Sequence, residues 1–125
     1  MPPYEIHVSN LEWLRDTCLS LPHATEDFPF DADVLVFRIG GKIFAMISVG
    51  NADSVNLKAL PELSEEWREQ YTQVTPGYHM NKTHWNTVYF EGLSHDFIQD
   101  MVVHSYTLVK QKLPLKLRQL YTGTQ

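Results

Sequence analysis

Residues 34–49 read VLVFRIGGKIFAMISV, two apolar runs on either side of a glycine pair. Val34 to Ile39 and Ile43 to Val49 are rich in the β-branched and aromatic residues that favour strands. Two adjacent glycines between strands are typical of a tight hairpin, because both turn residues need a positive φ. Apart from Arg38 and Lys42 beside the turn, both strands are apolar on both faces. We therefore expect them in the middle of a sheet that is covered on at least one side.

Helices are predicted on both sides of this hairpin. Each begins with residues suited to a helix N-terminus, namely a Ser–Glu capping box, a proline in the first turn or a serine cap. Apolar residues then recur at helical spacing along each segment. The predicted helices begin at Ser9, Pro61 and Ser94, the first ends at Pro22, the third extends to Lys112, and a short basic helix can follow Pro114 over residues 115–121.

The order of the predicted elements indicates the fold class. Further strands are expected over residues 54–57 and 87–90, and residues 23–33 are predicted as a loop with acidic character. The resulting order is helix, strands, helix, strands, helix. That order predicts a two-layer α+β domain over residues 1–125, with helices packed on one face of an antiparallel sheet.

The composition excludes several classes of protein. A chain of 125 residues with 43% hydrophobic and 20% charged residues is typical of one globular domain. No apolar run approaches the roughly 20 residues that span a bilayer, and the N-terminus lacks the basic and apolar regions of a signal peptide. We therefore expect a cytoplasmic protein without membrane contact. The single cysteine, Cys18, excludes an internal disulfide and a multi-thiolate zinc site. Because it lies on the apolar stripe of the first helix, we expect it in the core, with a reactive thiol as the alternative.

The charge balance limits how the chain can bind nucleic acid. The net charge is −5 and the pI is about 5.6. An acidic protein repels DNA at long range, so nucleic-acid binding needs a local basic patch. Charge is segregated along the chain: Lys110, Lys112, Lys116 and Arg118 cluster near the C-terminus, whereas Glu26, Asp27, Asp31 and Asp33 cluster early.

A polar and aromatic segment lies between the second helix and the last predicted strand. Residues 75–87 read TPGYHMNKTHWNT and contain two histidines, one lysine, one tyrosine and one tryptophan. Pro76-Gly77 predicts a turn at its start, with Gly77 in the positive-φ region. Because side chains on a turn beside a rigid sheet often carry function, this segment is the candidate binding surface.

The rings and the ammonium group of this segment point to nucleic acid. Trp85 and Tyr78 can stack on bases while Lys82 neutralises a phosphate, as on many surfaces that bind nucleic acid. The alternative is that Trp85 anchors the core and Lys82 is solvated. His79 and His84 could bind a transition metal, but their odd spacing places them on opposite faces of a strand. We therefore expect ordinary hydrogen bonds from these histidines and no metal.

Signatures of catalysis are absent from the sequence. Gly40-Gly41 joins two strands and precedes no helix, so it is not a phosphate-binding loop. There is no His-Glu-x-x-His motif and no local signature of a hydrolase triad, and Cys18 lies in mid-helix on an apolar face. We therefore expect a protein that is not an enzyme and holds no cofactor.

Two blocks of the sequence resemble the MmcQ/YjbR-like family. The first combines residues 26–30, EDFPF, with residues 36–45, VFRIGGKIFA, and the second is residues 76–88, PGYHMNKTHWNTV. Ser105-Tyr106 and Leu113-Pro114 resemble the closing helix of that family. The resemblance covers nearly the whole chain, although Asp31 stands where glycine is often expected.

The resemblance implies a frataxin-like (CyaY-like) double-wing fold in a small cytoplasmic bacterial protein, with DNA binding proposed from fold similarity. One wing would be the hairpin tip at Gly40, Gly41 and Lys42. The candidate residues for binding nucleic acid or another ligand are Arg38, Lys42, Tyr78, His79, Asn81, Lys82, His84, Trp85 and Asn86.

Three kinds of binding stay open at this point. A nucleic-acid module predicts an affinity that falls steeply with salt, and a protein or small-molecule partner predicts weak salt dependence. A frataxin-like metal site is the third, although no ligand spacing supports it. Its carboxylates would be Glu26, Asp27, Asp31 and Asp33.

Overall fold

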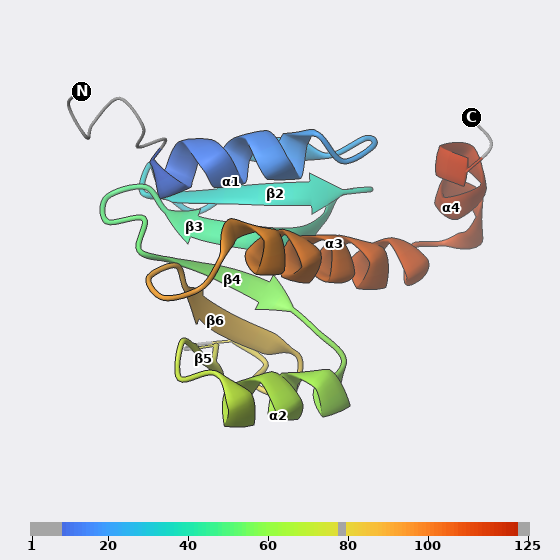
Figure 1. The fold of residues 1–125 in the computed structure, drawn as a ribbon. Helices are drawn as coiled ribbons and strands as arrows, with labels where there is room; N and C mark the ends of the chain where they lie inside the picture. The colour runs from blue at the N-terminus through green and yellow to red at the C-terminus, as the bar shows by residue number, and fades with distance from the viewer. Residues whose placement is uncertain (1–8, 78–79, 123–125) are drawn as a thin grey trace.

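The computed structural model of the chain, described for residues 9–77 and 80–122, is a sheet with helices on one face (Figure 1). The sheet is antiparallel throughout and its strand order is β1-β2-β3-β4-β6-β5. Its strands are β1 (Thr25–Asp27), β2 (Val34–Ile39), β3 (Lys42–Ser48), β4 (Ser54–Lys58), β5 (Val74–Pro76) and β6 (Trp85–Tyr89). The helices are α1 (Asn10–Leu19), α2 (Pro61–Gln70), α3 (His95–Gln111) and α4 (Leu115–Thr122). The predicted two-layer α+β class is confirmed.

The β2–β3 hairpin lies inside the sheet, as its apolar sequence predicts. Gly40 and Gly41 have φ values of 59° and 82°, so both turn residues adopt the positive φ that the glycine pair predicts. The strand register shifts between Phe37 and Arg38. This irregularity lets two consecutive residues of β3, Phe44 and Ala45, be fully buried in the same core.

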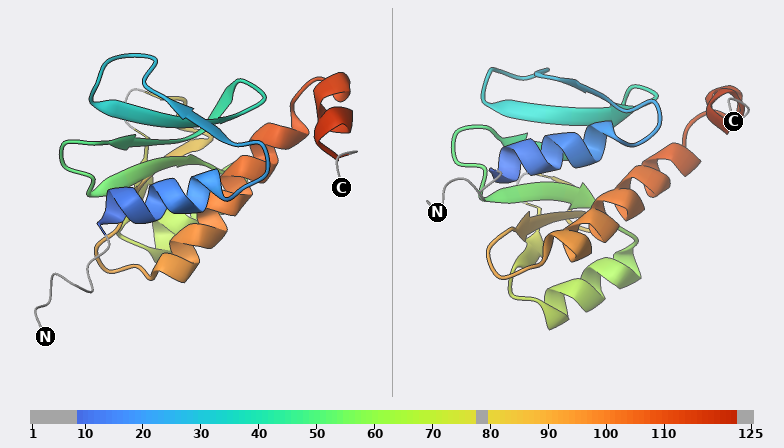
Figure 2. Two further views of the ribbon diagram at one scale, coloured as in Figure 1. Left: turned by 90° about the horizontal axis from the view of Figure 1, so that it is seen from above. Right: turned by 45° about the horizontal axis from the view of Figure 1, so that its top comes forward.

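Helices α1 and α3 lie side by side across one face of the sheet (Figure 2). Ser9 caps α1 through its hydroxyl, which accepts from the Glu12 amide at 3.1 Å, as the capping box predicts. The fully buried Ser105 fastens α3 to two strands: its hydroxyl donates to the Phe44 carbonyl at 2.6 Å and accepts from the Lys58 amide at 2.9 Å. Cys18 of α1 is fully buried, and burial raises the pKa of its thiol far above the usual range. The prediction of a core cysteine is confirmed.

Helix α2 packs beside α3 at the other end of the helical layer. The Leu60 amide at its start donates to His104 Nε2 on α3 at 3.3 Å. Trp67 stands edge-on to Phe97 and to the imidazole of His104, with ring centroids 6.2 and 5.7 Å apart. In the described part of the chain, no helix is both long enough and apolar enough to cross a membrane.

Two predictions of local structure are wrong. Thr25–Asp27 is a strand that pairs with β2, not part of a loop. Pro76 ends strand β5 instead of beginning a turn, and the amide of Gly77 continues the pairing by donating to the Trp85 carbonyl at 2.8 Å. Gly77 is also not among the positive-φ glycines. It is required for another reason: a Cβ at this position would lie 3.1 Å from Trp85 Cβ.

Candidate functional site

A cleft of about 480 Å³ opens at one end of the sheet. It lies where the β2–β3 hairpin, the last residue of β4, the first residue of β6 and the C-terminal end of α3 meet. The residues that line it are four cations, one indole, two aliphatic side chains and one glycine, namely Arg38, Lys42, Lys58, Lys112, Trp85, Ile43, Val109 and Gly41.

The strand register brings the cleft residues of the sheet together. Lys58 is the direct cross-strand partner of Trp85, and Arg38 is the partner of Ile43. Directly opposed residues on antiparallel strands project to the same face. The sheet therefore presents an ammonium group next to the indole, and a guanidinium next to an aliphatic side chain.

The hairpin tip is packed against the segment that follows α3. Leu113 is 3% exposed, and a Cβ on Gly40 would lie 2.6 Å from Leu113 Cδ1. A side chain at position 40 would therefore push the two segments apart. The close approach of Gly40 and Leu113 sets the distance between the hairpin and the end of α3. Lys112 is the C-cap residue of that helix.

Within the described part of the chain, Arg38 is the one cation of the cleft with a carboxylate partner. Its Nε donates to Asp27 Oδ1 at 2.8 Å, and a second guanidinium nitrogen donates to the Gly41 carbonyl at 2.9 Å. These bonds fix the guanidinium between β1 and the hairpin tip. Its charge is largely balanced by Asp27 before any ligand arrives.

The other three cations of the cleft are not balanced in this way. These cations are Lys42, Lys58 and Lys112. Within residues 9–77 and 80–122, no carboxylate lines the cleft, and the ion pairs, Arg15–Glu26 and Arg38–Asp27, involve no lysine. Partial burial lowers the pKa of Lys58, and the nearby charge of Lys112 lowers it further. The cleft is thus a concave region of positive potential on an acidic protein.

Three of the predicted site residues meet in this cleft. Arg38 and Lys42 come from the hairpin, and the half-buried Trp85 begins β6. Trp85 is held from several sides: its amide donates to the Asn81 carbonyl at 2.8 Å, and its carbonyl accepts from Arg68 at 3.1 Å. The indole therefore projects from a fixed backbone.

Asn86 is placed differently from its prediction as a binding residue. It is 1% exposed, its Oδ1 accepts from Arg68 Nε at 2.7 Å and its Nδ2 donates to the Ser64 hydroxyl at 2.9 Å. Both partners belong to α2. Asn86 therefore holds α2 on the sheet and does not face a ligand. Successive side chains of a strand point to opposite faces, so Asn86 points to the helix-covered face and Trp85 points away from it.

Among the described residues, the predicted Asn81, Lys82 and His84 do not line the cleft. Asn81 Oδ1 accepts from the Thr83 amide at 3.0 Å, which closes a turn, and the Lys82 carbonyl accepts from Arg68 at 2.6 Å while its ammonium group is exposed. The His84 carbonyl accepts from the Ala59 amide at 2.8 Å. Tyr78 and His79 lie outside the described residues.

Two cations of the cleft, Lys58 and Lys112, were not among the candidate site residues from sequence. Lys58 directly follows the predicted strand, and nothing local indicates that it pairs with Trp85. Lys112 belongs to the basic cluster near the C-terminus, but only the packing of Leu113 on Gly40 places it at the hairpin. Knowledge of the register between β4 and β6 would have identified Lys58 as a site residue, because that register pairs it with Trp85.

The early acidic residues are engaged in structural bonds. Glu26 accepts from Arg15 Nε at 2.7 Å and Asp27 accepts from Arg38, while Asp31 Oδ1 accepts from the Asp33 amide at 2.8 Å. A search of the described residues finds no group of three or more metal-ligating side chains. The structure therefore offers no support for a metal site here.

Comparison with known proteins places the chain in a family. Residues 19–108 match the YjbR family model. The chain is 36% identical to the uncharacterized protein YjbR of Escherichia coli K12 over 109 residues, which cover 86% of this chain and 92% of that protein. It is 38% identical to the uncharacterized protein YbdF of Escherichia coli O157:H7 over 100 residues, covering 78% and 82% of the two chains.

Solved structures agree with these matches. A crystal structure of a Deinococcus radiodurans protein with a DUF419 domain is similar with a TM-score of 0.80 and 35% identity, covering 88% of this chain and 85% of that one. A Pseudomonas syringae crystal structure shares the fold with a TM-score of 0.66 at 24% identity. The chain therefore belongs to the YjbR family.

Proposed function

We propose that this chain binds nucleic acid at the cleft between the β2–β3 hairpin and the end of α3, without catalysing a reaction on it. The observation that carries the proposal is the convergence of Lys42, Lys58 and Lys112 beside the Trp85 indole, with no carboxylate among the described residues of the lining. These three lysines come from three separate elements of an acidic protein.

Such a cluster is unfavourable unless an anion binds. Like charges that converge disfavour their own charged forms. Partial burial lowers the pKa of Lys58 first, and the charge of Lys112, which belongs to this cost, lowers it further. A phosphate group would relieve the repulsion between the lysines. Clefts lined by one sign of charge also concentrate counterions, so the ligand would be attracted to this end of an otherwise repellent molecule.

The indole supplies the second half of a nucleic-acid site. Aromatic faces stack on bases of any sequence, and a nearby ammonium group neutralises the backbone. The pairing of Lys58 with Trp85 puts these two groups on neighbouring strands and on one face. A base on the indole and its phosphate on Lys58 would therefore be adjacent parts of one ligand.

In this site, residues 76–88, which carry the family resemblance, have a structural role. Gly77 allows close approach to Trp85, and Asn81 closes the turn before Trp85. Asn86, the residue after Trp85, is bonded to α2. These residues position the indole instead of contacting the ligand. Gly77→Ala should weaken binding by displacing Trp85, although position 77 does not line the cleft.

Fluorescence anisotropy with labelled single-stranded and double-stranded oligonucleotides at two salt concentrations tests the proposal. With about three phosphates neutralised, the logarithm of the affinity should fall with the logarithm of salt with a slope of about −2 for single strands and about −2.7 for duplexes. Lys42→Ala should weaken binding and make the slope shallower by about 0.7 to 1. The matched control is Lys82→Ala, which removes an equally exposed ammonium group outside the cleft.

Two results would count against this function. Absence of binding at low salt for both kinds of oligonucleotide would remove it. Equal effects of Lys42→Ala and Lys82→Ala would show that binding, if present, does not use the cleft. A ligand whose affinity ignores salt would instead favour a protein or an uncharged small molecule as the partner.

A further inference from the structure

We infer that the unit recognised by the cleft is one unpaired nucleotide, a base together with its own phosphate, and not the surface of a duplex. This inference rests on the proposed function and makes it more specific. It concerns the shape of the cleft and the kind of side chains in its lining, beyond its positive charge.

The first observation is concavity. A cleft of about 480 Å³ lies within the range of roughly 300–1,000 Å³ typical of sites that enclose small molecules. A duplex presents a convex backbone and keeps its bases stacked inside. To place a base in such a cleft, the duplex would have to unpair and unstack it, which is unfavourable. A single strand or a free nucleotide pays little of this cost.

The second observation is the mixture of groups around the cleft. Trp85, Ile43 and Val109 provide aromatic and aliphatic surface that suits the faces of a base. Lys42, Lys58 and Lys112 provide donors for phosphate oxygens but no acceptors. A site for phosphate alone would have no use for the indole, whereas a site for an apolar molecule would not gather three ammonium groups. A nucleotide contains both kinds of surface in one unit.

The third observation is how rigidly the lining is held. Arg38 is fixed by Asp27 and by the Gly41 carbonyl, and the hairpin tip is packed on Leu113. The Trp85 backbone is bonded on both sides by the segment before it and by Arg68. A cleft with fixed walls selects by size, so one nucleotide fits where a stacked helix does not.

The experiment measures affinity for four ligands that differ in one property each. Deoxyadenosine 5′-monophosphate carries base and phosphate, deoxyribose 5-phosphate carries the phosphate without the base, and a short oligodeoxyadenylate carries unpaired nucleotides in a chain. A blunt-ended duplex of two complementary strands carries only paired ones. Binding of wild type and variants is followed at low salt by isothermal titration calorimetry, which does not depend on a tryptophan. In the wild type, stacking on Trp85 should also quench tryptophan emission.

Variants at position 85 show whether the fluorescence change and the stacking on the base come from Trp85. The chain has three tryptophans, and Trp13 and Trp67 pack against other rings of the fold, so Trp85→Phe isolates their contribution. Trp85→Ala should weaken binding of the single strand by about 5- to 150-fold, and Trp85→Phe should restore part of that loss. Circular dichroism of both variants shows whether they keep the native fold.

We expect the single strand to bind more tightly than the duplex, and the sugar phosphate to bind more weakly than the nucleotide. Comparison of nucleotide with oligonucleotide then tells a free nucleotide from a strand as the source of the same chemistry. A duplex that binds as tightly as the single strand, with equal effects of Trp85→Ala on both, would overturn this inference and leave the proposed function standing. Failure of every ligand to bind would overturn both.

Discussion

At the scale of single residues, neighbours in sequence have opposite roles in this protein. Trp85 and Asn86 are adjacent, yet one lines the cleft and the other is buried under α2. Alternation along β6 separates them, because successive side chains of a strand point to opposite faces. The segment that looked like a uniform binding surface is therefore half site and half scaffold.

Asn86 leads to the first prediction. Asn86→Ala should lower the free energy of unfolding by about 2–3 kcal/mol, because it leaves the fully buried Ser64 hydroxyl and the Arg68 guanidinium without an amide partner. Urea denaturation measures the change. Asn51→Ala, at an exposed turn position after β3, is the control and should stay within about 0.5 kcal/mol of wild type. A loss as small as that of the control would mean that this amide is not structural.

Residue chemistry alone could identify only part of the site. Trp85 was a candidate because an indole near a lysine can stack on a base. Arg38 and Lys42 were candidates through the family resemblance, which places a wing at the hairpin tip. Lys58 was not, because its partner across the sheet is 27 positions away and no local pattern sets that register. Asn86 was assigned to the surface because its polarity says nothing about which partners bury it.

At the scale of elements, the hairpin tip and the end of α3 form one packed unit. Gly40 and Gly41 both have positive φ, but only Gly40 has a side chain against it: nothing lies within 4 Å of a Cβ at Gly41. Alanine at either position therefore suffers the same kind of backbone strain. Alanine at position 40 additionally collides with Leu113.

This difference gives a matched pair of variants. Gly41→Ala should cost about 1–2 kcal/mol of unfolding free energy from the positive φ alone. Gly40→Ala should cost about 1–3 kcal/mol more, because Leu113 is buried and has to move. Denaturant titration of the two proteins measures the difference. Equal losses would show that Leu113 yields freely and does not set the distance between the hairpin and α3.

The Glu26–Arg15 pair connects strand β1 to helix α1 and predicts a pH dependence. The hydrogen bond from Arg15, followed by its charge, holds the pKa of Glu26 below its ordinary value of about 4.3, although slight burial opposes the shift. A carboxylate whose native pKa is depressed adds stability above its unfolded pKa and loses it as pH falls through the native one. Wild type should therefore exceed Glu26→Gln in stability above about pH 5, and the gap should close below about pH 4.

Thermal unfolding at a series of pH values checks this prediction. In an Arg15→Gln background the same Glu26→Gln change should have little dependence on pH, since the partner is already gone. A gap that persists unchanged into acid would assign the effect of position 26 to packing instead of charge.

The elements differ in how well the sequence predicts them. The hairpin and the three longer helices follow from apolar periodicity and caps, which are local. The strands β1 and β5 each span three residues at an edge of the sheet and form only because a longer strand lies beside them. The Pro-Gly pair predicts a turn because both residues are typical of turns. Proline is nevertheless tolerated at the end of β5, because an edge strand can leave one side without ladder bonds.

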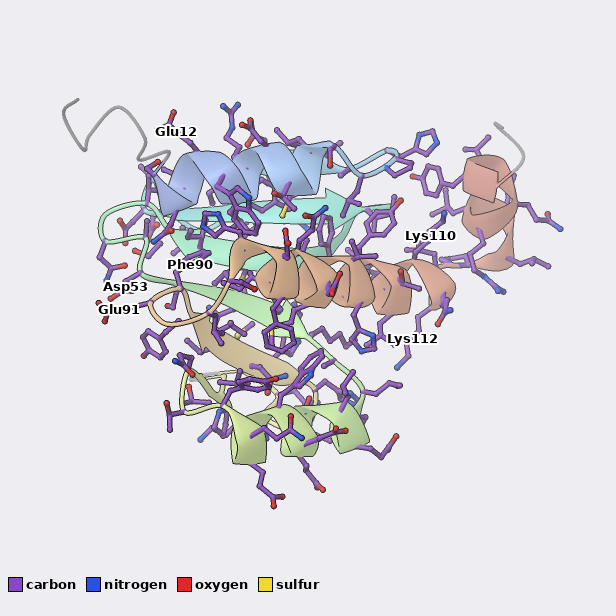
Figure 3. The ribbon with its side chains drawn as sticks, viewed as in Figure 1. Glu12, Asp53, Phe90, Glu91, Lys110 and Lys112 are labelled. Carbon is purple, nitrogen blue, oxygen red and sulfur yellow. The ribbon has the colours of Figure 1, made fainter. Side chains whose placement is uncertain are left out.

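At the scale of the whole molecule, some of the acidic and basic side chains lie at opposite ends of the sheet. Asp53 and Glu91 lie at one end of the sheet, whereas Lys110 and Lys112 lie at the C-terminal end of α3 (Figure 3). The net charge of −5 therefore conceals a basic end. Charges farther away than the Debye length, about 8 Å at physiological ionic strength, are largely screened by salt. An anion at the cleft therefore interacts more with the nearby lysines than with the distant carboxylates.

This division predicts that the acidic protein is retained on a heparin column near pH 7 at low salt, because heparin is a polyanion and the cleft offers uncompensated lysines. Lys42→Gln should reduce the salt dependence of retention by about one unit of slope, since one cationic contact is removed. Lys82→Gln changes the net charge by the same amount but lies outside the cleft, so its retention should match wild type. If both variants shift equally, net charge and not the arrangement of the lysines governs attraction to anions. This test uses no nucleic acid, so its outcome measures the electrostatics of the cleft separately from the identity of its ligand.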